Sequence, residues 1–394
     1  MKTGKILLLG SALLAAASTH AANCHGLPAL AAPAAAGLCA GVVASGLTLP
    51  RGIALLLDGS VLLTEMVRWD AAAGRLLRFT RTAGGWQKTV LARGLDRPHS
   101  VAVLPDGRVL VGEVGRISLL SLATPAQRRT VATLPLRQRH PLTSFTLAGD
   151  TLYVNIGSSS DNCNTQRGQP QCAEAEGSNP AGSVRRYRVL ADGRLQNLGV
   201  LARGLRNSMA IAVHPASGVV LQAENSRDAL HLAAGLPNDN ALPHDELNLL
   251  QAGSHYGWPY CHDMQQNAPE FPRYRCRTTL QPALLLPAHS APLGLAWWLG
   301  PQAPAAWRGQ LVVGLHGYRQ HGQRIVAYAT DSRGLPQGKP RTLLGPWRGQ
   351  GGPAGPVEIA AAADGALWFA DDRNGQLLRL ASQPGSRKAG ATSR

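Results

Sequence analysis

The chain has 394 residues, of which 44 are glycine and 27 are proline, whereas charged residues make up only 16%. This composition is typical of short strands joined by tight turns, and helical patterns are scarce. The formal charge of +16 comes almost entirely from scattered arginines, which indicates a solvated basic surface that suits anionic ligands and argues against a nucleic-acid groove.

The first 21 residues predict a signal peptide. Lys2 and Lys5 precede an apolar run from Ile6 to Ala17, and small residues lead up to a cleavage position at Ala21. No later stretch reaches the roughly 18 consecutive apolar residues of a membrane span. We therefore expect a periplasmic or secreted protein without a membrane span.

One pattern recurs six times along the rest of the chain: an apolar strand, a turn with glycine, and a second strand that ends in small or acidic residues. Asp-Gly between two apolar runs is the strongest short-range hairpin signal. Most copies are followed by a third strand, so each repeat resembles a propeller blade. The copies are Ile53–Glu65, Val101–Glu113, Phe145–Gly157, Ile211–Glu224, Leu293–Val313 and Ile359–Asp371.

We therefore predict an all-β fold, a six-bladed β-propeller of four-stranded antiparallel blades over residues 22–383, followed by a disordered basic tail over residues 384–394. The alternative, a β-sandwich with coincidental turns, does not explain six similar copies. Residues 227–285 are rich in Pro, Asn and His and form a longer segment than a blade needs. This segment is interpreted as an elaborated loop, and loops of such length are usually functional.

Six cysteines fall into three pairs that are close in the sequence. Export exposes them to oxidising conditions, which favour disulfides. Six cysteines allow 15 connectivities, and the local spacing favours three sequential bridges. Zinc binding is the alternative, but the C-x-x-C spacing is missing. The pairs are Cys24/Cys39, Cys163/Cys172 and Cys261/Cys276.

The turn that leads into each inner strand of a propeller lies at one mouth of the central channel, so equivalent positions of the six copies should converge there. They offer Arg, His, Asn and Ser, which suit an anionic planar ligand and a proton-abstracting base. The chain has no nucleophile elbow, P-loop or Rossmann glycine motif, which argues against the usual hydrolases and nucleotide enzymes. The converging segments are 50–51, 98–99, 140–144, 206–208, 289–292 and 355–356.

Residues 244–259 are dense in unusual side chains. Glu246 and the turn at Tyr256 offer a carboxylate and a backbone carbonyl to a hard cation such as calcium. A tight aromatic turn that packs on a blade is the alternative that the residues alone leave open.

These motifs resemble the soluble quinoprotein sugar dehydrogenases, the PQQ-dependent aldose and L-sorbosone dehydrogenase group of six-bladed propellers. The blade pattern extends the resemblance over roughly residues 40–382. The stretches that carry it are 152–158, 204–207 with His214-Pro215, 245–261 and 289–294.

The resemblance implies that His140 takes the proton of a sugar hydroxyl while hydride passes to PQQ, a role that suits imidazole because its pKa lies near working pH. It implies that Arg206 and Asn207 contact the quinone and stabilise its charge. The basic residue that meets the cofactor carboxylates is one of His316, Arg319 and Arg324.

The resemblance also implies calcium, which polarises the cofactor as a Lewis acid. Asn240 and Ala241 lie where the backbone ligands of a catalytic calcium are expected, and Glu246 and Tyr256 match a structural calcium site. The implied partners are a small-molecule sugar substrate and an external electron acceptor.

The chain departs from the family at two places. His140 is followed by Pro141 to Ser144 rather than by an arginine, and Gly355-Pro356 stands where the family has an arginine before the last blade. These departures motivate a second hypothesis, a non-catalytic propeller that binds a glycan or a protein at the channel mouth. A third hypothesis, a calcium-dependent lactonase, is disfavoured because the inner turns carry mostly bases.

Overall fold

The structure, a computed structural model, describes residues 23–163 and 169–384. The predicted signal peptide, residues 1–21, and the predicted tail, residues 384–394 apart from Pro384, lie outside the described residues. Within these residues, no helix is long and apolar enough to cross a membrane.

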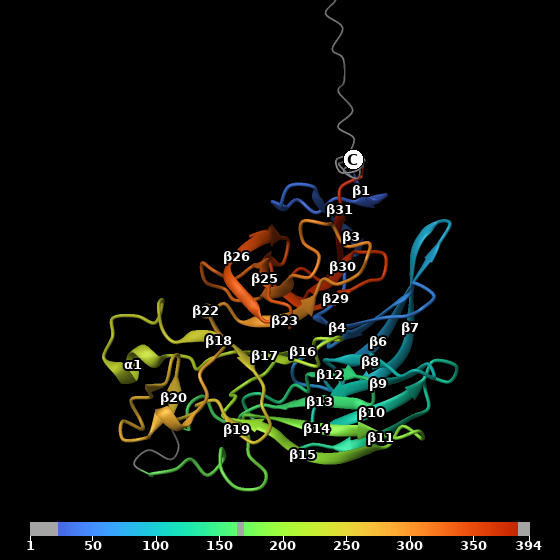
Figure 1. The fold of residues 1–394 in the computed structure, drawn as a ribbon. Coiled ribbons are helices and arrows are strands. Elements are labelled where there is room, and N and C mark those ends of the chain that lie inside the picture. The colour runs from blue at the N-terminus through green and yellow to red at the C-terminus, as the bar shows by residue number, and fades with distance from the viewer. Residues whose placement is uncertain (1–22, 164–168, 385–394) are drawn as a thin grey trace, which may run out of the picture.

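Six sheets, each with four antiparallel blade strands, form the body of the molecule (Figure 1), which confirms the predicted all-β, six-bladed propeller. The short strand Ser254–His255 adds a parallel fifth strand to the sheet of blade 3. Blade 1 comprises β4 (Pro50–Leu55), β5 (Val61–Glu65), β6 (Gly74–Thr82) and β7 (Gly85–Leu95), and blade 2 comprises β8 (Val101–Val103), β9 (Arg108–Glu113), β10 (Arg116–Ser121) and β11 (Arg128–Thr133). Blade 3 comprises β12 (Phe145–Ala148), β13 (Thr151–Ile156), β14 (Ser183–Val189) and β15 (Leu195–Arg203), and blade 4 comprises β16 (Ala210–Val213), β17 (Val220–Glu224), β18 (His244–Leu249) and β22 (Leu284–Ala288). Blade 5 comprises β23 (Pro292–Trp297), β24 (Leu311–Leu315), β25 (Arg324–Thr330) and β26 (Pro336–Leu344), and blade 6 comprises β29 (Pro356–Ala361), β30 (Leu367–Asp371), β31 (Gln376–Ser382) and β3 (Leu38–Ala44).

The first strand of each repeat faces the axis. The strands β4, β8, β12, β16, β23 and β29 contact one another in a closed ring and gather at the centre of Figure 1. All six begin at the same end of the channel, and the second strand of each blade returns to that end because the pairs are antiparallel. The channel mouth therefore collects the starts of first strands and the ends of second strands.

The hairpins form where the Asp-Gly pattern predicts them. In blade 1, Gly59 has a φ of +79°, which glycine adopts without steric cost. The Asp58 carboxylate accepts the Ser60 N–H at 2.9 Å and thereby closes the turn. The turn chemistry thus sets the register of β4 against β5.

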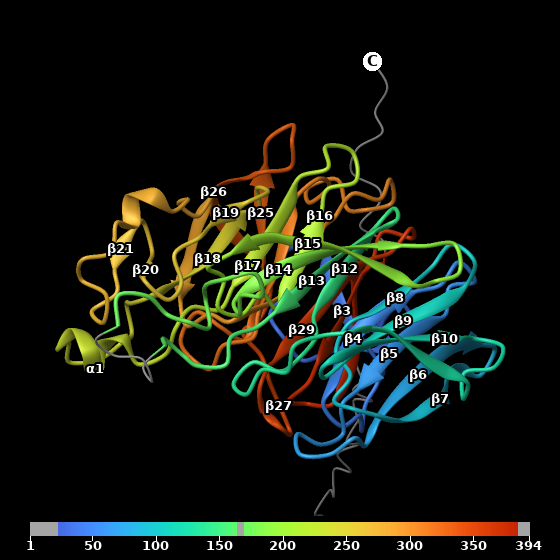
Figure 2. The same ribbon diagram turned by 90° about the horizontal axis from the view of Figure 1, so that it is seen from below.

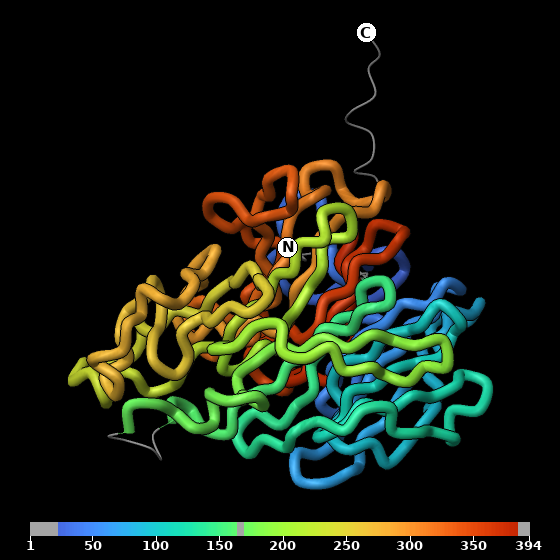
Figure 3. Tube along the Cα trace, turned by 60° about the horizontal axis from the view of Figure 1, so that its bottom comes forward, coloured from blue at the N-terminus to red at the C-terminus, as the bar shows by residue number. Residues whose placement is uncertain are grey.

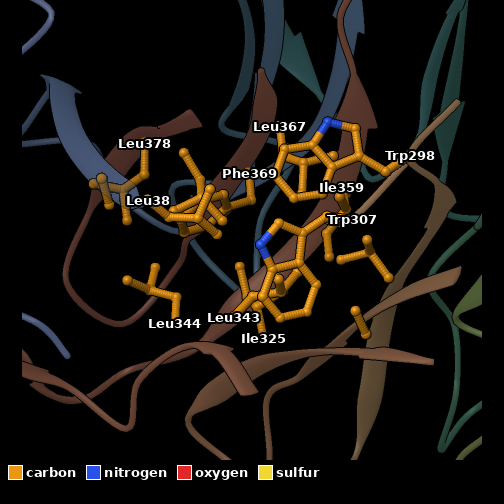
Figure 4. Close-up of a cluster of buried hydrophobic side chains, with 14 of the residues drawn as sticks. Leu38, Trp298, Trp307, Ile325, Leu343, Leu344, Ile359, Leu367, Phe369 and Leu378 are labelled. Atoms are coloured by element: carbon orange, nitrogen blue, oxygen red, sulfur yellow. The ribbon is translucent and has the colours of Figure 1, made fainter. Parts of the chain in front are cut away.

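Each blade is buried on both faces because it packs between two neighbours. Leu367 and Phe369 of β30 lie in a cluster with Trp298 of blade 5 (Figure 4). The alternate residues Trp368 and Ala370 lie in a different cluster with residues of blade 1. The two-residue period of the strand therefore divides one apolar run between two cores.

The last blade takes its fourth strand from the start of the chain. β3 pairs antiparallel with β31, and the blue and red strands lie together in Figure 1. The Cys24–Cys39 disulfide joins the short hairpin of β1 (Asn23–Cys24) and β2 (Leu27–Pro28) to β3. This ring closure was not predicted.

The prediction that residues 227–285 form only a loop is wrong in part, because they contain β18 and the first residues of β22, two strands of blade 4. The remainder does project from the body, with the labelled elements α1 and β20 at one side of Figure 2 and the yellow and orange tube at the left of Figure 3. Its other elements are α1 (Leu230–Ala234), β19 (Ser254–His255), β20 (Cys261–His262), β21 (Gln266–Asn267) and the 3-10 helix Cys276–Thr278.

The three sequential disulfides are confirmed as Cys24–Cys39, Cys163–Cys172 and Cys261–Cys276. No cysteine of the described chain is free, which removes the thiolates that zinc binding would need. The second and third bridges share one apolar cluster with Tyr260 and Phe271. Packing between the two bridges therefore holds the β13–β14 loop of blade 3 against the β18–β22 loop of blade 4.

Candidate active site

An apolar cluster crosses the channel just below its mouth. It contains one buried residue from each of the six blades, and residues of all six blades meet only on their common axis. The polar candidates flank it in sequence, since His140 precedes Leu142 and Arg206 precedes Met209. We call this cluster the channel floor: Met66, Val114, Leu142, Met209, Leu293 and Val357.

His140 lies directly before β12 and is held by the loop after β13. Its N–H donates to the Ser158 carbonyl at 3.1 Å, and its Nδ1 lies 2.8 Å from Ser158 Oγ. Ser158 Oγ donates its single proton to the Ser160 carbonyl at 2.6 Å. The Ser158 oxygen therefore accepts from Nδ1–H of His140, and this tautomer leaves the lone pair on Nε2.

The environment keeps His140 uncharged. Burial, followed by the charges of Arg206 and Arg139, lowers the pKa of His140 to about 2. The imidazole is therefore neutral at neutral pH, which is the state that a base requires. His140 also lies near Arg206 through the backbone, because the Ser158 N–H donates to the Arg206 carbonyl at 2.9 Å.

The Arg206 guanidinium is buried and fixed on two of its three nitrogens. Nη2 lies 2.6 Å from Asp161 Oδ1 and 3.0 Å from Asp228 Oδ2. Nη1 donates to the carbonyls of Asn225 at 2.8 Å and Ser226 at 2.9 Å. These contacts orient the group, while its buried Nε–H has no partner in the described chain.

Asn207 continues the same turn. Its Oδ1 accepts from Asn155 Nδ2 at 3.4 Å, and its backbone N–H donates to Glu224 Oε1 at 3.3 Å. These contacts hold the Asn207 side chain next to the Arg206 site, as the resemblance implies. Its side-chain NH₂ donates to no other described residue, so it is available to a ligand.

A second polar cluster joins blades 1, 5 and 6 at the mouth, and we call it the Arg51 cluster: Arg51, His316, Asp372 and Arg373. Arg51 Nη1 lies 3.0 Å from Asp372 Oδ2, and both side chains are buried. His316 lies between the other two members, with Nε2 2.9 Å from Asp372 Oδ1 and Nδ1 3.0 Å from Arg373 Nη2. Burial lowers the pKa of His316, so positive charge in the cluster resides on the two arginines.

Aromatic rings flank both arginines of this cluster. Arg51 Cζ lies 5.2 Å from the ring centroid of Trp69, and Arg373 Cζ lies 3.5 Å from that of Tyr318. Both rings are exposed. The mouth therefore presents flat apolar ring surfaces beside guanidinium groups, and each ring can hold its guanidinium by a cation–π contact.

Four buried nitrogens around the mouth lack a hydrogen-bond partner in the described part of the chain: Nε of Arg51, Arg206 and Arg373, and Nε2 of His99. Buried polar groups are nearly always satisfied, so these four nitrogens are available to a ligand rich in acceptor oxygens. Three arginines favour negative charge on it. PQQ, with its carboxylates and quinone carbonyls, fits this donor set.

The three basic candidates around residues 316–324 have different surroundings. His316 belongs to the Arg51 cluster. Arg324 instead donates to the carbonyls of Gln320 at 2.7 Å and Gly322 at 3.1 Å, within its own turn. The structure therefore brings His316, but not Arg324, to the arginines of the mouth.

The Arg319 side chain reaches the loop between β17 and β18, in which the resemblance implies a catalytic calcium. Its Nη1 lies 2.6 Å from Asp239 Oδ1 and 2.8 Å from Asn240 Oδ1. Asn240 and Ala241 are exposed, and a calcium ion there would face this guanidinium. The residues of this loop therefore do not fit a calcium ion, and no step below uses one.

Glu246 has a different environment. It lies opposite Glu224 on the neighbouring strand, and both are buried. Burial and then the charge of Glu224 raise the pKa of Glu246 well above its ordinary value, and two such carboxylates fit a divalent cation. Tyr256 is not linked to Glu246 by a hydrogen bond in the described chain; its hydroxyl donates to the Leu249 carbonyl.

The turns before first strands predict Arg51 and His99 at the mouth, but these turns do not include Asp372 and Arg373. Those two residues follow β30, a second strand. In an antiparallel hairpin both positions lie at the same end. Aligning the ends of the second strands would therefore have revealed the Arg51 cluster.

A cavity of about 540 Å³ lies beside Arg206. Asp161 and Asp228, which bind that arginine, line it together with the buried ion pair of Arg227 and Glu270 and with the exposed Leu232. Carboxylates and an apolar patch on one wall suit a polyhydroxylated ligand.

The molecule is a six-bladed propeller whose channel mouth carries a neutral imidazole and guanidinium N–H groups without partners in the described chain. The family model described as glucose/sorbosone dehydrogenase matches residues 136–379. The chain therefore belongs to the glucose/sorbosone dehydrogenase family, which confirms the resemblance.

Solved structures share the fold. The chain is 21% identical to a carbohydrate-active enzyme of family AA12 from Trichoderma reesei, with a TM-score of 0.72 over 92% of this chain and 100% of that chain. It is 22% identical to the holo form of the pyranose dehydrogenase PQQ domain from Coprinopsis cinerea, with a TM-score of 0.70 over 91% and 99%. The PQQ-bound aldose sugar dehydrogenase from Streptomyces coelicolor gives 19% identity and a TM-score of 0.60 over 89% and 99%.

Among curated proteins, the chain is 29% identical over 190 residues to an uncharacterized protein from Borreliella burgdorferi. That match covers 46% of this chain and 48% of the relative, so it spans about half of either protein.

Proposed function

We propose that this chain is a PQQ-dependent dehydrogenase that oxidises an aldose or a related sugar and passes the electrons to an external acceptor. Family membership supports sugar-dehydrogenase activity. The observation that carries the proposal is a neutral His140 with Nε2 free, next to Arg206 with an unpartnered N–H.

In this proposal His140 Nε2 accepts the proton of the substrate hydroxyl, and Ser158 holds the imidazole in the required tautomer. PQQ, when bound, supplies the quinone that accepts the hydride. Arg206 stabilises negative charge on the acceptor oxygens, while Asp161 and Asp228 keep its guanidinium in place. An anionic ligand at Arg206 offsets the guanidinium charge and so raises the pKa of His140 toward its ordinary value, where imidazole is a stronger base.

The arginines and aromatic rings of the Arg51 cluster would hold the anionic edge of the cofactor. Arg51 and Arg373 thereby replace the arginine that the family has before the last blade and that Gly355-Pro356 does not provide. This replacement weakens the argument for a non-catalytic propeller.

The cavity beside Arg206 is the proposed sugar subsite. Its carboxylates, Asp161 and Asp228, accept hydrogen bonds from hydroxyl groups, and Leu232 offers an apolar contact to the sugar ring. Both carboxylates are already paired with arginines, which argues against a lactonase that holds calcium at the channel centre.

Calcium belongs to the proposal as a structural ion near Glu246 rather than as a catalytic group. Export to the periplasm or the exterior is also part of it, because three disulfides suit an oxidising compartment.

The experiment adds PQQ and calcium to the purified protein and records the absorbance of the cofactor and dye-linked oxidation of aldoses. We expect saturable binding and turnover. His140→Ala should retain PQQ binding but lose at least about 10²-fold in kcat, whereas His25→Ala, in the distant N-terminal hairpin, should behave as the wild type. Absence of PQQ binding would overturn the proposal, and PQQ binding without turnover of any sugar would favour the non-catalytic alternative.

A further inference from the structure

A second cavity lies at the opposite end of the channel from the mouth. It has a volume of about 540 Å³ and is bounded by four of the six inner strands, β12, β16, β23 and β29. Most of the side chains that line it are apolar, among them Ile211, Leu295 and Trp297. The channel floor separates this cavity from His140 and Arg206, so it does not belong to the site described above.

Glu358 enters this cavity from a β-bulge. The register of β29 against β30 shifts between Val357 and Ile359, so Glu358 is the extra residue that has no partner across the sheet. Its φ of +44° is a left-handed conformation that L side chains rarely adopt. Bulges of this kind redirect a side chain next to functional sites, and glycine would occupy the position without strain.

The carboxylate of Glu358 has no counter-charge. No hydrogen bond or ion pair of the described residues reaches it, and it is the one charged side chain among those that line the cavity. The chain carries 39 lysines and arginines, yet none lines this space. The side chain is part-buried, and desolvation raises the pKa of Glu358 to about 8. A positive charge placed beside the carboxylate would favour its ionised form.

The neighbouring elements offer no alternative partner. The imidazole of His214, which follows β16, packs edge-on against the ring of Trp297 with 5.1 Å between the ring centroids, and its Nδ1 lies 3.0 Å from Ser217 Oγ. Trp297 Nε1 donates to the Gly334 carbonyl at 2.9 Å. His214 Nδ1 and Trp297 Nε1 are therefore engaged by other groups, while Trp297 forms part of the cavity wall.

We propose that this cavity binds a small organic cation, an ammonium group attached to an apolar body, with Glu358 as the counter-ion. A metal ion would need several oxygen ligands, and the walls offer one carboxylate. An anion would meet the charge of Glu358, and a neutral apolar molecule would leave the carboxylate unpaired. The size and the apolar walls suit an aryl-alkyl amine.

This site is independent of the proposed dehydrogenase activity, so the two fail separately. The probe is phenethylamine, titrated into the full-length protein by calorimetry, with 2-phenylethanol as its uncharged analogue. A ligand of this size binds with a Kd of roughly 10 µM to 1 mM. We expect saturable binding of the amine at pH 8 and at least about tenfold weaker binding of the alcohol.

The pH dependence gives a second readout. Glu358 must lose a proton before it can pair with the cation, while alkylammonium groups stay charged up to about pH 10. Affinity should therefore rise roughly 50-fold between pH 6 and pH 8, with release of about one proton per ligand at pH 6. In Glu358→Gln the affinity for the amine should fall to that for the alcohol and lose its pH dependence.

Two control variants make the result specific. Asp364→Asn removes an exposed carboxylate from the turn after β29 and should leave binding unchanged, as should His140→Ala, which acts on the other side of the floor. Circular dichroism verifies that Glu358→Gln is folded. The proposal is overturned if the wild type does not bind phenethylamine at pH 8, or if Glu358→Gln binds it equally well.

Discussion

Replacing Asp372 with asparagine should destabilise the fold far more than loss of an exposed ion pair would. Asp372 Oδ2 lies 3.0 Å from Arg51 Nη1, and the side chains are 4% and 5% exposed. The substitution leaves the guanidinium buried without its counter-charge. Breaking a buried pair from one side costs about 3–5 kcal/mol.

The pKa of Asp372 provides an independent magnitude. Burial raises this pKa, but His316 and Arg51 outweigh burial and lower it from 3.8 to about 2. The difference corresponds to about 2 kcal/mol of stability. Because the folded-state pKa is depressed, this stability is present above pH 3.8 and is lost as the pH falls through 2. We therefore expect Asp372→Asn to cost about 2–5 kcal/mol at pH 7 and less as the pH approaches 2.

Urea unfolding at pH 7, followed by circular dichroism with a common m-value, measures this cost. The matched control is Asp364→Asn on the same blade, because Asp364 pairs with Arg379 at 2.7 Å but is 57% exposed. The control should lose less than about 1 kcal/mol. Replacing both partners, Arg51→Met with Asp372→Leu, should recover most of the loss, since no charge is stranded. A cost for Asp372→Asn no larger than that of Asp364→Asn would refute the reasoning.

Two further predictions concern single groups. The His140 imidazole should remain neutral from pH 5 to 8 with the proton on Nδ1, because burial and Arg206 lower its pKa to about 2. Nitrogen NMR of labelled histidine measures this protonation state, and Arg206→Met should raise the pKa of His140. A titration of His140 near pH 6.5 in the wild type would contradict the reasoning. Calcium should raise the midpoint of thermal unfolding, because it can bind the adjacent carboxylates of Glu246 and Glu224 in place of the protons that burial keeps on them. Glu246→Gln should abolish most of the rise, and an equal rise in that variant would place the ion elsewhere.

The hairpins were predictable because their signals are local. An Asp-Gly turn such as Asp58-Gly59 and the two-residue apolar period lie within about a dozen residues, so each strand pair is encoded in its own segment. Six copies then imply a closed ring. The pairing of β3 with β31 could not be predicted in this way, since no local pattern relates residues at opposite ends of the chain.

The candidate-site residues that could be predicted are those that precede a first strand of the repeat and also belong to a motif of the family. His140 and Arg206 satisfy both, and the structure brings them together through Ser158. Asp372 and Arg373 were missed because they belong to a different turn of the repeat. The sequence does not single out Glu358, because its conformation depends on a bulge that the repeat pattern does not reveal.

The pairing of β3 with β31 closes the ring of blades by joining the two ends of the described chain in one sheet. The sheet of blade 6 is complete only after the last strand has been synthesised, so an emerging chain carries β3 unpaired for most of its length. Removal of β3 would expose the backbone N–H and C=O groups of β31 as a free sheet edge, a template for association with other chains. The Cys24–Cys39 bridge ties the preceding hairpin of β1 and β2 to β3, the strand that closes the ring.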